Sequence, residues 1–146
     1  MQREPGPDAT DWWTLQEKAA KAIRKIDPDV PIIVEANEGD SPEAFSYMSP
    51  LELTNVVYET HMYLPMAFTH QGVFSSGDAL IAYPNAEKGW NIDFLRQQLK
   101  PVRDFQLKHG ARIYAGEFSA VAWAPGAEKH LADCISLFEE YGRNWT

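Results

Sequence analysis

Helical and strand-like segments alternate along this chain, and that alternation restricts the fold more than any other feature. Three short runs predict strands, at 31–36, 55–62 and 112–118, and the first of them is rich in β-branched residues. Longer stretches with apolar residues at three- and four-residue steps predict helices, at 11–26, 92–109 and 127–141. This order is typical of an α/β fold with a parallel sheet.

Local signals refine these elements. Thr10 or Asp11 is the expected N-cap of the first helix, and Pro101 predicts a kink or break within the second. The run at 31–36 is apolar without alternation, which predicts a strand buried on both faces. Residues 144–146 can open a further strand, and residues 1–3 can end an earlier one. The long loops at 37–50 and 63–91 are typical of functional segments.

Charge and length exclude several classes of protein. The 146 residues carry 13 Lys and Arg against 21 Asp and Glu, a net charge of −8, which argues against nucleic-acid and anionic-membrane partners. No window reaches the roughly 20 apolar residues of a membrane span. Residues 1–7 have no apolar stretch that could be a signal peptide. The sequence does not indicate the cellular compartment. One domain over 1–146 is expected, with the single cysteine, Cys134, in its core.

Polar side chains gather at the predicted strand ends, where parallel α/β folds hold their functional residues. With the chain start taken as the end of a strand, these residues are Glu4, Glu35, Asn37, Glu38, His61, Tyr63 and Glu117. Carboxylates together with a histidine and a tyrosine suggest general acid/base and nucleophilic chemistry. A glutamate at a strand end is nevertheless more often a solvated or capping carboxylate.

Other polar and aromatic residues allow competing interpretations. A zinc site of Glu59, His61 and His70 is not expected, because the two histidines are nine residues apart without helical register. No metal and no cofactor is therefore predicted. His109 and His130 fall in helices and are expected at the surface. Trp123, in a loop, can serve as a platform for a sugar ring, and a packing role is equally open.

Several strings resemble the second half of a family five glycoside hydrolase, the cellulase type. The strongest matches are HMYLP at 61–65, FTHQG at 68–72 and GEF at 116–118. Further matches are REP at 3–5, IRKIDPDVPIIVEA at 23–36, VVYETHMYLP at 56–65, IYAGEFSA at 113–120 and FEEYGRNWT at 138–146. The resemblance covers essentially the whole chain.

The resemblance implies a partial TIM barrel, roughly strands five to seven with the ends of strands four and eight. It implies Glu4 as acid/base and Glu117 as nucleophile of a retaining mechanism, with His61 and Tyr63 lining the substrate site. Arg3 departs from the pattern, because the family has an asparagine there that binds the sugar 2-hydroxyl. A full barrel needs about 250 residues, so the early strands are absent from these 146 residues.

The implied reaction is hydrolysis of a β-1,4-linked polysaccharide or oligosaccharide, cellulose or a related glucan, with mannan left open. The competing interpretation is a catalytically incomplete fragment that at most binds carbohydrate or serves a structural role. Half of a barrel leaves strand edges unpaired, so we expect a homodimer or a complementary half-barrel as partner. The family is often secreted, and the sequence leaves the localisation undetermined.

Overall fold

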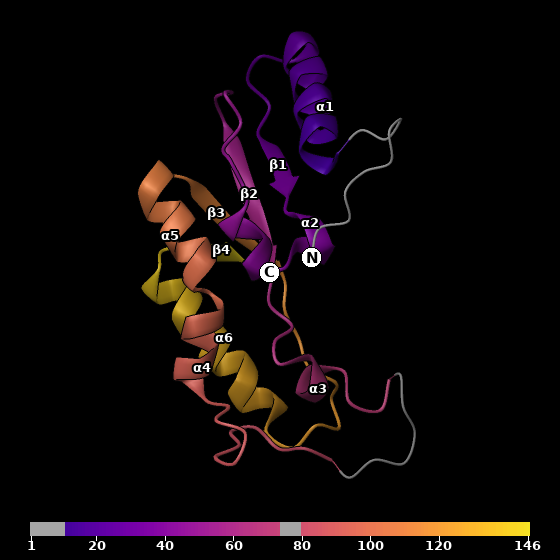
Figure 1. Cartoon of the computed structure of the whole chain (residues 1–146), viewed down its shortest axis with the longest axis vertical. Helices are drawn as coiled ribbons and strands as arrows, with labels where there is room; N and C mark the ends of the chain where they lie inside the picture. Colours follow the sequence, from indigo (N-terminus) through magenta and orange to yellow (C-terminus); the bar gives the residue numbers. More distant parts are fainter. Residues whose placement is uncertain (1–10, 74–79) are drawn as a thin grey trace.

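One parallel sheet with helices around it forms the computed structural model, which describes residues 11–73 and 80–146 (Figure 1). Its four strands pair in sequence order and are β1 (Ile32–Glu35), β2 (Val56–His61), β3 (Arg112–Glu117) and β4 (Asn144–Trp145). Its helices are α1 (Trp12–Ile26), α2 (Asn37–Asp40), the 3-10 helix η1 (Pro42–Ser46), α3 (Met66–Thr69), α4 (Ile92–Gln98), α5 (Lys100–His109) and α6 (Ala127–Glu140). Helices α4, α5 and α6 lie together on one side of the sheet, and α1 lies beside β1.

This architecture confirms the predicted α/β class. The runs at 31–36, 55–62 and 112–118 form β1, β2 and β3, and the tail forms β4. The helix predicted over 92–109 is divided into α4 and α5, with Pro101 in the first turn of α5, as its fixed φ angle allows. The strand end predicted at residues 1–3 lies outside the described residues.

Strand β1 differs from its prediction on one face. Ile32 and Val34 are buried, but Ile33 between them is 52% exposed. Side chains alternate across a strand, and among the described residues no layer covers the face on which Ile33 lies. The prediction of burial on both faces is therefore wrong.

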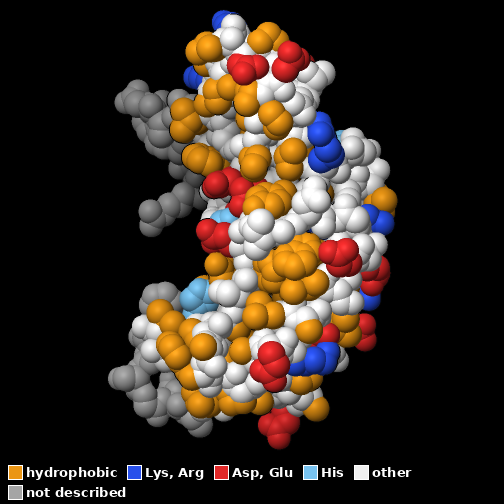
Figure 2. All heavy atoms as spheres, turned by 180° about the vertical axis from the view of Figure 1, so that it is seen from behind, with side chains coloured by type: hydrophobic (Ala, Val, Ile, Leu, Met, Phe, Trp, Pro, Cys, Tyr) orange, Lys and Arg blue, Asp and Glu red, His pale blue; other side chains and the backbone are white. Residues whose placement is uncertain are grey.

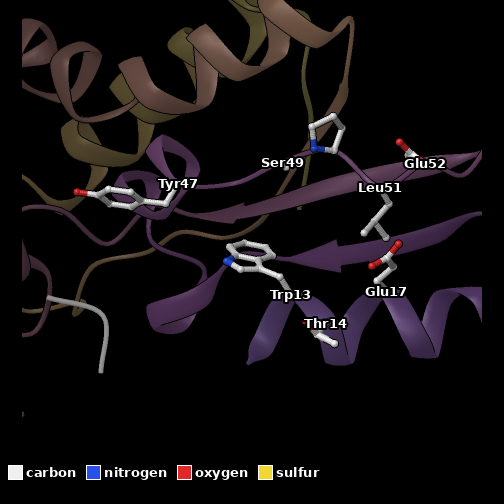
Figure 3. A pocket seen from close by; sticks show the side chains of 8 residues that line it. Trp13, Thr14, Glu17, Tyr47, Ser49, Leu51 and Glu52 are labelled. Carbon is white, nitrogen blue, oxygen red and sulfur yellow. The ribbon is translucent and has the colours of Figure 1, made fainter. Parts of the chain in front are cut away.

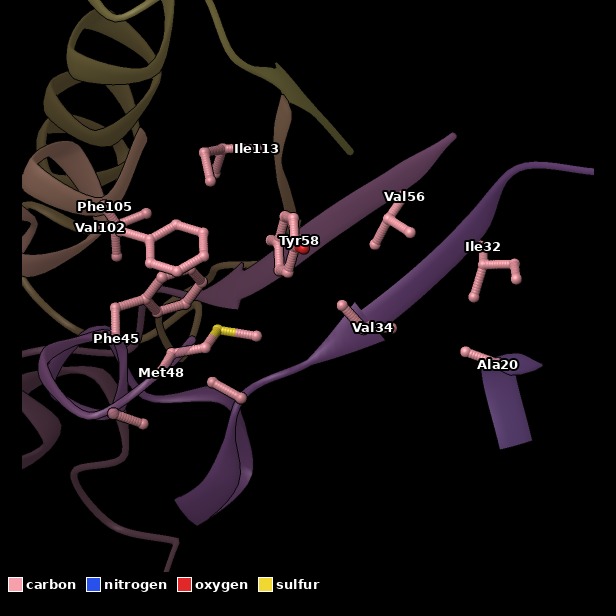
Figure 4. Close-up of a cluster of buried hydrophobic side chains, with 12 residues drawn as sticks. Ala20, Ile32, Val34, Phe45, Met48, Val56, Tyr58, Val102, Phe105 and Ile113 are labelled. Atoms are coloured by element: carbon pink, nitrogen blue, oxygen red, sulfur yellow. The ribbon is translucent and has the colours of Figure 1, made fainter. Parts of the chain in front are cut away.

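The first hydrophobic core joins the sheet to η1 and α5 (Figure 4). Phe105 of α5 packs edge-on against Phe45 of η1 and Tyr58 of β2, with ring centroids 5.3 and 5.0 Å apart. The Tyr58 hydroxyl accepts a hydrogen bond of 2.9 Å from the Leu51 N–H. The loop between β1 and β2 is thereby held against β2.

The second core lies between β3, α4 and α6 and contains Cys134, as predicted. Burial raises the pKa of the Cys134 thiol to about 12. His109 is exposed as expected, whereas His130 is fully buried, so its predicted surface position is wrong. His130 lies on the inner face of α6, where its Nε2 is 3.0 Å from the carbonyl of Leu64.

Helix α1 begins where the sequence predicts, but its apolar stripe is mostly uncovered. The Asp11 side chain caps the helix by accepting a 3.0 Å hydrogen bond from the Thr14 N–H. Leu15, Ile23 and Ile26 are 49%, 44% and 88% exposed. Helix α1 packs on the first core through Ala20 and Trp13 instead, and the Gln16 amide donates a hydrogen bond to the Glu35 carbonyl.

Candidate active site

Three of the residues singled out in the sequence meet at the carboxyl ends of β2 and β3. His61 is the last residue of β2 and lies in register with Glu117, the last residue of β3. An irregularity between Thr60 and His61 shifts the register at this point. Tyr63 follows two residues after His61, so all three side chains reach the same edge of the sheet.

The Glu117 carboxylate is the centre of this group. Tyr63 donates a hydrogen bond of 3.1 Å from its hydroxyl to Glu117 Oε2, and His61 Nδ1 lies 3.3 Å from the same oxygen. The Glu117 side chain is 53% exposed and therefore open to a ligand. Partial burial, together with the negative charge of Glu117, raises the pKa of Tyr63. The tyrosine thus remains a hydrogen-bond donor throughout the neutral range.

The other nitrogen of His61 faces two further carboxylates. Nε2 lies 3.4 Å from Glu59 Oε1 and 3.8 Å from Asp40 Oδ2. The Asp40 side chain is completely buried, and burial raises its pKa to about 8, against an opposing hydrogen bond from the Ala36 N–H. Asp40 is therefore a largely neutral carboxyl group at pH 7 when no cation is bound.

Asp40 reaches this position through the backbone of the loop after β1. Glu38, Gly39 and Asp40 all have positive φ angles, of 60°, 67° and 59°. The Asp40 Oδ1 accepts a hydrogen bond of 2.5 Å from the Ala36 N–H, which closes the loop. Two of these three residues are not glycine, so the loop holds an unfavourable backbone conformation beside the candidate site.

Sequence reasoning missed Asp40 and did not give Glu59 a role. The signal for Glu59 was present, because it lies two residues before His61 and therefore on the same face of β2. The sequence held no comparable signal for Asp40. Its side chain is oriented by a loop with positive φ angles, and no periodic pattern of residues predicts such a loop.

A pocket of about 230 Å³ opens beside these residues. His61 and Tyr63 form one wall, and the ring of His70 packs against Tyr63 with centroids 5.1 Å apart. The complete lining is Glu38, Gly39, Ser41, Pro42, His61, Tyr63, Leu64, Met66 and His70. In the space-filling view, acidic and histidine side chains gather around a hollow in one face of the molecule (Figure 2).

The remaining candidates are placed differently. Trp123 is 55% exposed, and its indole N–H donates a 3.1 Å hydrogen bond to the carbonyl of Gln71. Its ring lies over Gly72, outside the lining of the pocket. Glu4, the predicted acid/base, and Arg3 lie outside the described residues. Glu35 and Glu38 are exposed and belong to none of the contacts around Glu117.

A second cavity, of about 340 Å³, lies between α1 and the loop after η1 (Figure 3). Trp13 and Tyr47 border it together with the carboxylates Glu17 and Glu52. It shares no lining residue with the pocket beside His61. The hydrogen-bonded group around Glu117 is therefore separate from it.

None of the helices in residues 11–73 and 80–146 is long and apolar enough to cross a bilayer.

Comparison with known proteins relates this arrangement to carbohydrate hydrolases. Residues 3–146 match the family described as "Cellulase (glycosyl hydrolase family 5)". Endoglucanase C of Acetivibrio thermocellus is 31% identical in an alignment 163 residues long. The alignment covers 92% of this chain and 48% of that protein. Cellodextrinase A of Ruminococcus flavefaciens is 23% identical over 92% of this chain and 44% of its own length. The chain spans about half the length of the curated relatives it matches.

Solved endoglucanase structures also match this chain over less than half of their own length. An endoglucanase superposes with a TM-score of 0.82 at 26% identity, over 92% of this chain and 45% of that chain. The Thermotoga maritima endoglucanase in complex with mannotriose superposes with a TM-score of 0.79 at 26% identity, with the same coverage. The four-stranded sheet thus matches part of the TIM barrel of these enzymes.

Proposed function

The chain belongs to glycosyl hydrolase family 5, the cellulases, and we propose that it is the C-terminal half of a retaining β-1,4-glucanase barrel with Glu117 as nucleophile. The observation that carries the proposal is the pair of contacts on Glu117 Oε2 made by Tyr63 and His61. A carboxylate that is oriented by a neutral donor and still half exposed is suited to attack a sugar carbon.

The proposed reaction has two steps. Ionised Glu117 attacks the anomeric carbon and forms a glycosyl ester, while a second carboxyl group, protonated, gives its proton to the departing glycosidic oxygen. That second group then takes a proton from water, which attacks the same carbon and releases Glu117. We assign this role to Glu4 because residues 3–5 resemble the family's motif. In retaining enzymes generally, the two carboxyl groups lie about 5 to 5.5 Å apart.

Tyr63 and His61 serve this reaction by orienting Glu117. The Tyr63 hydroxyl stabilises the ionised carboxylate, and His61 binds either this carboxylate or a sugar hydroxyl. Trp123 offers an exposed indole face to a further sugar ring. The proposed substrate is a cellulose-type polysaccharide or oligosaccharide, with mannan as the alternative, and the reaction of these residues uses no cofactor.

Incubation with an activated 2-deoxy-2-fluoro cellobioside tests this proposal, because the fluorine slows hydrolysis of the glycosyl ester. We expect the intact mass to rise by one glycosyl group, mapped by peptide analysis to Glu117. Glu117→Gln should form no adduct, whereas Glu35→Gln, at the corresponding end of β1, should react like the unchanged protein. An adduct on another residue would contradict the assignment of Glu117.

The second candidate function is a binding module without turnover. It is favoured by Arg3, which stands in the position of the family asparagine. Calorimetric titration with cello-oligosaccharides separates the two proposals. Binding by a folded protein that forms no covalent adduct would favour the module.

We propose further that a second polypeptide covers the open part of the sheet, either another copy of this chain or a complementary half-barrel. The support comes from β1 and β4, which form the two sides of the described sheet and have no strand beyond them. Mixing experiments distinguish the partners, since a homodimer forms from the pure chain and a heteromer does not.

A further inference from the structure

A compact group of three potential metal ligands lies below the pocket. Asp40 Oδ2, Glu59 Oε1 and His61 Nε2 are all within 4.8 Å of one another. They come from two elements, because Asp40 ends α2, and Glu59 and His61 lie on the same face of β2. The nucleophile assigned above, Glu117, is not one of the three.

Asp40 provides the independent sign that a ligand belongs here. Its side chain is completely buried, and its Oδ2 has no hydrogen-bond partner among the described residues. That atom points toward His61 Nε2, from which it is 3.8 Å away. A buried carboxylate oxygen without a partner is costly, because desolvation is then not compensated.

The charges around this oxygen also favour a cation. Within residues 11–73 and 80–146, no lysine or arginine forms an ion pair with Asp40, Glu59 or Glu117, and their shared basic neighbour is His61. If Nδ1 of a neutral His61 carries its proton toward Glu117, then Nε2 presents a lone pair to two carboxylate oxygens. A cation that binds between these atoms would displace the Asp40 proton and gain the buried carboxylate oxygen as a ligand.

We propose that Asp40 Oδ2, Glu59 Oε1 and His61 Nε2 together bind a divalent transition-metal ion, with zinc as the best match. One imidazole and two carboxylates are a donor set that zinc accepts, with a water in the fourth position. Ligand atoms about 2.1 Å from a tetrahedral zinc ion lie about 3.4 Å apart. The distance from His61 Nε2 to Glu59 Oε1 is 3.4 Å, and that to Asp40 Oδ2 is 3.8 Å.

This site differs from the zinc set considered in the sequence. His70 is not a member, because its Nδ1 lies 2.8 Å from the Thr69 hydroxyl, and Asp40 takes its place. Gly116 of β3 makes room for the set, since a Cβ there would lie 1.7 Å from Glu59 Oε1. The absence of a side chain at Gly116 thus leaves room for the Glu59 carboxylate beside His61.

The metal would also act on Glu117 through His61. A histidine that binds a metal through one nitrogen commonly donates its other N–H to a carboxylate, which fixes the tautomer and the ring orientation. His61 Nδ1 lies 3.3 Å from Glu117 Oε2, in the place of that second partner. The ion and the Glu117 carboxylate would then be coupled across one imidazole ring.

Titration of the untagged, metal-free 146-residue chain with Co²⁺ tests the site, because protein-bound Co²⁺ absorbs visible light according to its coordination geometry. We expect a visible band that saturates at one equivalent per chain and disappears when Zn²⁺ displaces the cobalt. Glu59→Gln, which changes a partly exposed side chain, should weaken binding at least about tenfold. Asp40→Asn should act in the same direction.

Glu38→Gln is the matched control, because it removes one negative charge two residues from Asp40 without removing a ligand. It should bind Co²⁺ like the unchanged chain, and far-ultraviolet circular dichroism should show that each variant is folded. The proposal fails if no saturable band forms, or if Glu59→Gln and Glu38→Gln bind equally well. These outcomes do not depend on hydrolysis, so the metal site and the glucanase proposal can fail separately.

Discussion

The hydrogen bond from Tyr63 to Glu117 is the contact on which the proposed chemistry depends most directly. The Tyr63 hydroxyl is 3.1 Å from the carboxylate oxygen that His61 also approaches. A hydrogen bond to a charged group contributes about 1.5 to 3 kcal/mol. The orientation of the nucleophile therefore depends in part on this phenol.

Replacement of this tyrosine should lower the rate of the chemical step without unfolding the chain. We expect Tyr63→Phe to reduce kcat, or the rate of glycosyl trapping, between about tenfold and a hundredfold, with a small change in KM. Tyr114→Phe is the control, because within the described part of the chain its hydroxyl bonds only to the Thr146 side chain, 2.8 Å away. Equal rates for the two variants would contradict the role assigned to Tyr63.

His130 gives the chain a pH-dependent stability at a distance from Glu117. Burial lowers its pKa in the folded state, so the unfolded chain binds a proton first as the pH falls. Its contribution to stability is therefore complete above the unfolded pKa of about 6.5 and is lost as the pH falls below that value. At lower pH the folded state must either open around α6 or accept a buried charge.

Urea unfolding between pH 7.5 and pH 5 measures this effect. As the pH falls over this range, the raised pKa of Asp40 adds stability while the lowered pKa of His130 removes it. Toward pH 5 we therefore expect the free energy of unfolding of His130→Gln to rise relative to that of the unchanged protein. His109→Gln, which changes an exposed histidine on α5, should keep the original slope. If His130→Gln keeps that slope as well, His130 is not the titrating group.

At the scale of elements, the sequence predicts the sheet better than it predicts the loops. The period of apolar residues places β2 and β3, and the strand-end rule then brings His61 and Glu117 to one edge. The period of apolar residues is a poorer guide to the packing of α1, whose apolar stripe is exposed. A periodic pattern shows which face of a helix is apolar, but not whether another element covers that face. Asp40 escapes prediction because a loop with positive φ angles, rather than a periodic element, orients its side chain.

The start of α6 depends on a glycine with two separate constraints. Gly126 caps the helix with φ +86°, and a Cβ there would lie 1.8 Å from the Tyr83 carbonyl oxygen. That oxygen belongs to the backbone, which cannot turn away as a side chain can. The loop before α6 and the segment around Tyr83 are also joined by a 2.9 Å hydrogen bond from the Tyr83 N–H to the Pro125 carbonyl.

We therefore expect Gly126→Ala to destabilise the chain by at least about 2 kcal/mol, through backbone strain and the clash together. Gly110→Ala is the comparison, because Gly110 also has a positive φ, of 60°, but nothing lies within 4 Å of its Cβ position. It should cost about 1 kcal/mol. Chemical denaturation measures both values, and equal losses would show that the contact with Tyr83 is relieved without cost.

On the scale of the whole molecule, polarity changes along the open face of the sheet. Ile33 of β1 lies in register with Val57 of β2, and both are exposed or half-buried. One step closer to the carboxyl ends, Glu35 lies in register with Glu59. The carboxyl end of this face is thus polar and carries the candidate sites, while the other end is apolar and uncovered. Exposed apolar surface beside an unpaired strand favours association with another chain.

A charge at the apolar end should oppose that association. We expect the unchanged protein to show a mass above that of one chain in light scattering, rising with concentration, and Ile33→Lys to shift it toward the monomer. Leu107→Lys changes a 65% exposed residue on α5, on the helical side of the sheet, and should leave the mass unchanged. If both lysine variants behave like the unchanged protein, the chains associate through another surface. If the unchanged protein is monomeric at every concentration, a homodimer is excluded, and a complementary half-barrel becomes the partner to seek.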